Sequence, residues 1–130
     1  HAAIYNWTVQ QAEEDCRQYS YWLYGGWANE QTELYAQRSP ITFAANIKTP
    51  LSITHGKADV NVPFIQVDDF LSKARAAGVR LEYRFYEGEG HGYKRPENHR
   101  DSYERTLQFL NKHLKPWNFL TNPKKGQRLE

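Results

Sequence analysis

The chain has 130 residues, of which 39% are hydrophobic and 25% are charged, a composition that suits one modest domain with its own hydrophobic core. Its net charge of +2 is too small to indicate nucleic acid or an acidic membrane surface as a partner, and no apolar run approaches the roughly 20 residues that span a bilayer. The single cysteine, Cys16, excludes an internal disulfide but leaves the compartment open between the cytoplasm and the periplasm or secretion.

The chain contains no methionine, so we expect it to be a piece of a longer protein. Residues 1–115 are expected to form the folded part. Residues 116–130 end in TNPKKGQRLE and are expected to form a solvated tail. The final Leu129-Glu130 fits a vector-derived end as well as a native one.

The first half of the chain contains three predicted elements and one predicted loop region. Residues 2–9, AAIYNWTV, form an apolar and β-branched run that predicts a strand buried on both faces. Residues 10–26 have helical character and close on two glycines, which is a stop signal. The mixed segment 27–49 predicts loops, and residues 50–56, PLSITHG, predict a short strand between a proline and a glycine.

The second half predicts a helix, a strand and a final helix. Apolar residues spaced three and four apart over 64–78 predict an amphipathic helix that begins next to Pro63 and ends at Gly78. Residues 79–86 alternate apolar and charged side chains, which predicts a strand. The final helix ends before Pro116 and is marked by four apolar residues, namely Tyr103, Leu107, Leu110 and Leu114.

This order of elements predicts an α/β fold with about three parallel strands and right-handed crossover helices. In such sheets, functional groups gather beyond the carboxyl ends of the strands. Two loops meet this condition, because residues 55–63 carry Asp59 and residues 87–95 carry His91. We therefore expect these two side chains to lie close together.

An aspartate beside a histidine is an arrangement that activates a nucleophile. The carboxylate fixes the tautomer of the imidazole, and the imidazole takes the proton of a hydroxyl or thiol. Asp59 precedes His91, which is their chain order in α/β-hydrolases. The glycines at 88, 90 and 92 indicate a loop that turns tightly to place the imidazole. The alternatives are an Asx turn at Asp59 and an ordinary surface histidine at position 91.

Two long stretches resemble the prolyl oligopeptidase family of serine peptidases. They are RSPITFAANIKTPLSITHGKADVNVPFIQ, around the aspartate, and YEGEGHGYKRPENHRDSYERTLQFLNKHL, around the histidine. The similarity covers residues 2–115 and is nearest to the acylaminoacyl-peptidase and dipeptidyl-peptidase branches. It implies the C-terminal portion of an α/β-hydrolase catalytic domain, with Asp59 and His91 as the acid and base of a Ser-Asp-His triad that acts on peptide substrates. It implies no cofactor.

The chain departs from this family because it lacks the G-x-S-x-G elbow that carries the nucleophile. No serine has a glycine two residues before it, whether Ser20, Ser39, Ser52, Ser72 or Ser102. We expect the nucleophile, most of the oxyanion hole and a β-propeller domain upstream in the same polypeptide, so that this chain is inactive alone. A half sheet would also expose a strand edge through which copies of the chain can associate.

Four other side chains are candidates for a role. In the resembled family, the segment that contains Trp7 and Tyr19 walls the pocket for the substrate residue before the scissile bond, so both are candidate substrate contacts, with plain packing as the alternative. Cys16 has the right chain order for a nucleophile but lies in a predicted helix without an elbow. His55 is expected to hydrogen-bond near the acid loop. A metal site that combines it with the acid and the base lacks the usual ligand spacing.

Two other functions stay open at this point. One is an esterase or another hydrolase on the same fold, since this fold hosts many activities. The other is a binding or interaction fragment without catalysis. The upstream sequence would discriminate between a peptidase and an esterase, because a propeller domain favours a peptidase and a small lid favours an esterase.

Overall fold

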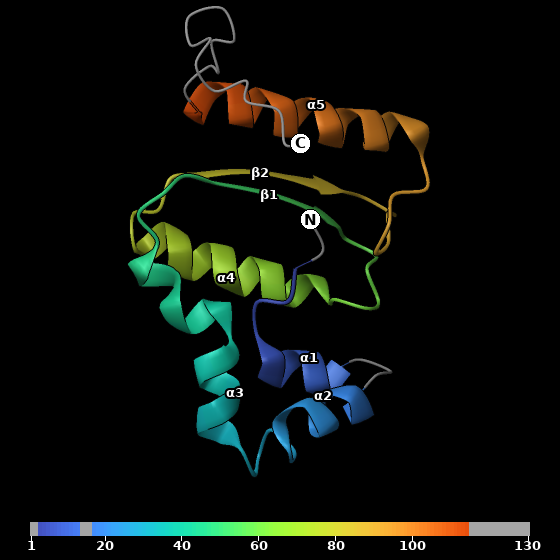
Figure 1. The fold of residues 1–130 in the computed structure, drawn as a ribbon. Helices are drawn as coiled ribbons and strands as arrows, with labels where there is room; N and C mark the ends of the chain where they lie inside the picture. Colours follow the sequence, from blue (N-terminus) through green and yellow to red (C-terminus); the bar gives the residue numbers. More distant parts are fainter. Residues whose placement is uncertain (1–2, 14–16, 115–130) are drawn as a thin grey trace, which may run out of the picture.

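A parallel two-stranded sheet lies between two helices in the computed structural model, which describes residues 3–13 and 17–114 (Figure 1). The strands are β1 (Leu51–Gly56) and β2 (Leu81–Tyr86). One face of the sheet is covered by α4 (Phe64–Ala76) and the other by α5 (Pro96–His113). The N-terminal elements lie beyond α4: α1 (Trp7–Glu13), α2 (Arg17–Tyr24), α3 (Thr32–Arg38) and the 3-10 helix η1 (Pro40–Asn46).

The two strands and α4 form one parallel crossover unit. The pairing runs from Leu51 opposite Leu81 to Gly56 opposite Tyr86. Both strands therefore end at the same edge of the sheet, where the two loops that follow them start side by side. The predicted strands and the predicted helix between them are confirmed, and so is the neighbourhood of the two loops.

The hydrophobic core lies between α4, the sheet and the N-terminal segment. Helical spacing brings one side of α4 into this core, where the ring of Phe70 stacks on that of Tyr5 with 4.4 Å between centroids. Burial of each large side chain of this kind stabilises the fold by about 1.5–3 kcal/mol. The buried cluster consists of Tyr5, Ile41, Ala44, Ile53, Val67, Phe70, Leu71 and Ala74.

The strand predicted for residues 2–9 is wrong. Residues 3–6 are irregular and α1 begins at Trp7, because the Asn6 side chain accepts hydrogen bonds from the amides of Thr8 (3.1 Å) and Val9 (3.3 Å) and so caps the helix. The carbonyl of Tyr5 accepts a bond from the amide of Ile41 at 2.9 Å, not from a strand. The described residues thus form two strands instead of about three.

The segment before β1 differs from the prediction, and the structure supplies the start of the last helix, which the apolar pattern left open. The segment 27–49, predicted as loops, contains α3 and η1. The last helix begins at Pro96, well before the apolar residues that indicated it, because proline at the first helical position has no amide hydrogen to leave unpaired. Residues in that first part of the helix are mostly charged or polar, so no apolar residues at helical spacing indicate where the helix begins.

The apolar stripe of α5 is exposed within the described part of the chain. Three of its residues and the leucine that follows the helix are between 42% and 72% exposed, namely Tyr103, Leu107, Leu110 and Leu114. Polar side chains connect the helix to β2 instead: Asp101 accepts a hydrogen bond from the hydroxyl of Tyr86 at 2.8 Å. Within the described ranges, no helix combines the length and the apolar character needed to cross a membrane.

Candidate active site

The acid loop holds the carboxylate of Asp59 in one orientation. Oδ1 of this residue accepts hydrogen bonds from the amides of Asn61 and Val62, both at 2.9 Å, and its own amide donates to the carbonyl of Gly56 at 3.3 Å. The side chain of Asp59 is fully buried. The two backbone hydrogen bonds replace part of the hydration that a buried carboxylate loses, and they fix its orientation.

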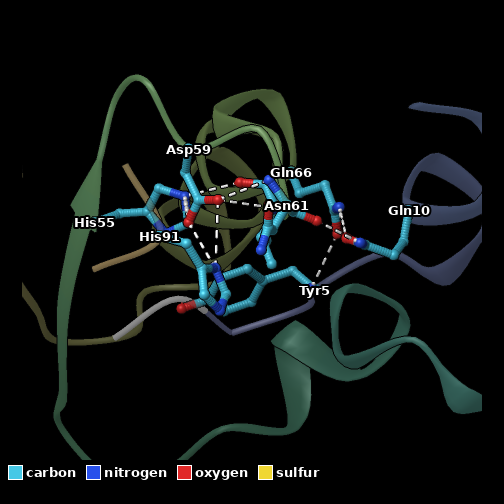
Figure 2. A network of polar contacts seen from close by, with 8 residues as sticks. Tyr5, Gln10, His55, Asp59, Asn61, Gln66 and His91 are labelled. Carbon is cyan, nitrogen blue, oxygen red and sulfur yellow. Dashed lines mark hydrogen bonds and ion pairs between the residues drawn. The ribbon is translucent and has the colours of Figure 1, made fainter. Parts of the chain in front are cut away.

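Figure 2 shows His91 facing this carboxylate from the neighbouring loop. The Nδ1 atom of His91 lies 3.1 Å from Oδ2 of Asp59 and 3.3 Å from Oδ1. Since an ionised carboxylate only accepts hydrogen bonds, Nδ1 carries the ring proton and the neutral imidazole can accept a proton at Nε2. The side chain of His91 is 48% exposed, so the pair combines a buried acid with an accessible base.

His55 is a second histidine beside the acid, with a different role. It is fully buried, and its Nε2 lies 2.9 Å from the carbonyl oxygen of Val62 and 3.6 Å from Oδ2 of Asp59. Burial lowers the pKa of His55 below its usual value, so the neutral ring donates to Val62 and braces the acid loop. The expected hydrogen bond near that loop is confirmed. Nδ1 of His55 has no hydrogen-bond partner among the described residues.

No grouping of three or more metal-binding side chains occurs within residues 3–13 and 17–114. The alternative nucleophile Cys16 lies outside the described residues.

A pair of buried glutamines joins the N-terminal segment to the acid loop (Figure 2). The side-chain amide of Gln10 donates to the carbonyl of Asn61 at 2.6 Å, and that of Gln66 donates to Gln10 at 2.5 Å. Oε1 of Gln66 accepts bonds from the amides of Tyr5 (3.2 Å) and Asn6 (3.0 Å). No local sequence pattern indicates this pair, because the two glutamines are 56 positions apart.

The two candidate substrate contacts occupy different places. Trp7 directly follows the segment that Gln66 holds, is half-buried, and meets the ring of Tyr24 edge to face at 5.3 Å. Its amide donates to Oγ of Ser39 at 2.9 Å. Tyr19 lies on α2 and is 57% exposed. A role in substrate binding stays a prediction for both residues.

Only one of the three glycines around the histidine has a conformation that requires glycine. Gly88 has a φ of +71°, whereas a Cβ at Gly92 would meet nothing within 4 Å and one at Gly90 would make an ordinary contact of 3.7 Å with the carbonyl of Ala58. The steric need lies instead at Gly56, where a Cβ would come within 2.3 Å of the carbonyl oxygen of Glu89. This close approach lets the acid loop and the histidine loop touch.

The family of the chain follows from its sequence. The family model described as "Prolyl oligopeptidase family" matches residues 1–116. The chain belongs to this family. The resemblance inferred from the two loop sequences is therefore confirmed.

Two named peptidases have sequences related to that of this chain. Dipeptidyl aminopeptidase BIII of Pseudoxanthomonas mexicana is 38% identical over 64 residues, which is 49% of this chain and 9% of that protein. Dipeptidyl-peptidase 5 of Porphyromonas gingivalis is 30% identical over 102 residues, which is 75% of this chain and 15% of that protein. The chain thus spans a small fraction of the length of these relatives.

A similar solved structure shows the fold. The acylaminoacyl peptidase of Pyrococcus horikoshii matches with a TM-score of 0.77 and 22% sequence identity, over 91% of this chain and 20% of that one. The described residues therefore form part of an α/β-hydrolase fold, in agreement with the α/β class predicted from the order of elements and with the α/β-hydrolase domain implied by the family resemblance.

Proposed function

We propose that this chain supplies the base, His91, and its orienting acid, Asp59, to the Ser-Asp-His triad of a serine peptidase. The observation that carries the proposal is the 3.1 Å contact between Nδ1 of His91 and Oδ2 of Asp59, at the ends of adjacent parallel strands. The names of the related proteins, which are dipeptidyl peptidases and an acylaminoacyl peptidase, support peptide bonds as the substrate class.

The geometry suits the four proton transfers of such a reaction. A serine hydroxyl attacks the peptide carbonyl and gives its proton to Nε2 of His91. The imidazolium, stabilised by the carboxylate of Asp59, then protonates the leaving amine as the carbon–nitrogen bond breaks. Water, deprotonated by the same nitrogen, attacks the acyl-enzyme, and the returned proton restores the serine as the acid product leaves.

We infer that residues 1–115 are the C-terminal portion of a catalytic domain, and that the serine and a β-propeller domain lie upstream in the same polypeptide. The small share of the relatives' length that the chain spans, at most 15% for the two named peptidases, supports this. Two features of the structure support it too. The apolar stripe of α5 is exposed, and in the described residues β1 and β2 pair only with each other, so that each has an open edge. Half of a domain would leave such surfaces uncovered. Association of chain copies through the sheet edge stays a prediction.

The test uses the natural polypeptide that contains this chain, labelled with a fluorophosphonate and assayed with a dipeptidyl anilide and a matched ester. We expect labelling of the long polypeptide, hydrolysis of the anilide, and loss of hydrolysis in His91→Ala. His99→Gln is the matched control, because His99 is an exposed histidine on α5. Full activity of His91→Ala would refute the proposed base, labelling of the 130-residue chain alone would refute the missing nucleophile, and hydrolysis of the ester alone would favour an esterase.

A further inference from the structure

Glu89 lies two residues before His91 and is a buried carboxylate, only 1% exposed. Its Oε2 accepts a hydrogen bond from the amide of Lys94 at 2.6 Å. Its Oε1 accepts bonds from the amide of Arg95 at 3.1 Å and from the side-chain amide of Asn98 at 2.6 Å. All three donors follow His91 in the sequence, so the carboxylate closes the loop that carries the imidazole.

The main chain of Glu89 also contacts the acid loop. Its carbonyl oxygen accepts a hydrogen bond from the amide of Ala58 at 2.9 Å, and Ala58 directly precedes Asp59. The missing side chain at Gly56 makes room for this contact. One residue therefore connects the loop of the base to the loop of the acid.

The charge of Glu89 is suited to this place. Three hydrogen-bond donors surround it, and α5, which begins at Pro96, has no side-chain cap from the residue before it. A carboxylate near the amino end of a helix is favoured by the helix dipole. The hydrogen bond from the amide of Lys94 and that from Asn98 lower the pKa of Glu89 below its usual value, so the group is ionised at neutral pH.

Two other roles of Glu89, contact with a substrate and general-acid catalysis, are excluded by its burial and its ionisation. A side chain that is 1% exposed does not reach a substrate, and an ionised carboxylate does not serve as a general acid near neutral pH. The remaining role is to set the position of its neighbours.

We propose that Glu89 is a positioning residue, which holds the histidine loop closed against the acid loop and so keeps His91 within hydrogen-bond distance of Asp59. This inference rests on the proposed function, in which His91 is the base. Because a displacement of about 1 Å at a reacting group can cost about 100-fold in rate, loss of this anchor should lower kcat by up to about 100-fold with little change in KM.

The experiment compares Glu89→Ala and Glu89→Gln in the natural polypeptide. Glutamine keeps the shape but replaces one accepting oxygen by an NH2 group, which cannot accept a hydrogen bond from a backbone amide, so we expect a smaller loss of kcat than for alanine. Glu87→Gln is the matched control, because the Glu87 side chain is 79% exposed and pairs with Lys57 at the surface. It should keep the kcat of the unchanged protein. All assays are run at a temperature where each variant is fully folded.

A second readout follows the hydrogen bond itself. NMR should show a low-field proton signal for Nδ1 of His91 in the unchanged protein and in Glu87→Gln, and a weakened signal in both Glu89 variants. If Glu89→Ala does not fold, Glu89→Gln decides alone. An unchanged kcat and proton signal in the Glu89 variants would overturn the proposal, and so would an effect confined to KM. If the proton signal weakens while His91→Ala keeps full activity, the anchor is supported and the proposed function is the part that fails.

Discussion

Replacing Gly56 with alanine tests the contact between the two loops. The new Cβ would lie 2.3 Å from the carbonyl oxygen of Glu89 and 2.4 Å from that of Gly90. Both are backbone atoms, so no side-chain rotation relieves the clash. Since ordinary contact begins at 3.4 Å, the histidine loop must move away from β1 by about 1 Å.

This movement has a cost that can be worked from the structure. Forcing an extra methyl group into a packed site costs about 1–3 kcal/mol, and the hydrogen bond from Ala58 to Glu89, now 2.9 Å long, contributes about 1 kcal/mol. We expect Gly56→Ala to lower the free energy of unfolding by about 2–4 kcal/mol and, in the long polypeptide, to lower kcat by about 100-fold.

Urea denaturation and peptide-anilide kinetics measure these two effects. Gly92→Ala is the stability control, because its Cβ would meet nothing within 4 Å and a tolerated alanine commonly stabilises a protein by about 0.4–1 kcal/mol. A free energy of unfolding for Gly56→Ala within about 0.5 kcal/mol of the unchanged protein, the range of a neutral substitution, would refute the reasoning.

Three further predictions concern the acid, the loop anchor and the exposed helix face. Asp59→Asn should lower kcat by up to about 10⁴-fold, because an NH2 group facing Nδ1 of His91 favours the tautomer that cannot accept a proton at Nε2; an activity close to the original in a pH-rate profile would contradict this. The lowered pKa of Glu89 means that its ionised form contributes stability above about pH 4.3, the ordinary glutamate value, and that this contribution is lost as the pH falls through the pKa in the folded protein. The difference in the urea concentration at the unfolding midpoint between the unchanged protein and Glu89→Gln should therefore become smaller in acid. A difference that stays constant between pH 7 and 3 would contradict this stabilising role of the ionised Glu89. Leu107→Ser should change the unfolding free energy of the 130-residue chain by less than about 0.5 kcal/mol, since Leu107 is 60% exposed, yet destabilise the long polypeptide by more than 1 kcal/mol; equal effects in thermal melts of both would argue against an upstream partner for this face.

The parts that the sequence predicted are those with a local pattern. The spacing of Val67, Phe70 and Leu71 identified α4, and alternation identified β2, because one side of each element faces the core. The pairing of Asp59 with His91 followed from topology, since the ends of neighbouring parallel strands meet at one edge of a sheet. The 3.1 Å contact between the two side chains agrees with that argument.

The parts that the sequence missed depend on contacts between distant residues. An apolar run over residues 2–9 predicts a strand, but the Asn6 cap and the bonds from Tyr5 and Asn6 to Gln66, 60 or more positions away, make it an irregular segment that leads into a helix. Gly56 was predicted as the end of a strand, and its steric role depends on a loop more than 30 positions further along. The buried Glu89 was hidden for the same reason, because its acceptor role depends on donors that follow the histidine.

The bridge formed by Gln10 and Gln66 has a practical consequence for anyone who modifies this protein. The same two amides support the backbone just before Trp7 and the carbonyl of Asn61 beside the acid. A substitution of either glutamine therefore disturbs both the backbone before Trp7 and the acid loop near Asp59. Variants of α1 and α2 that are meant to leave the acid loop unchanged should therefore keep both glutamines and alter outward-facing positions.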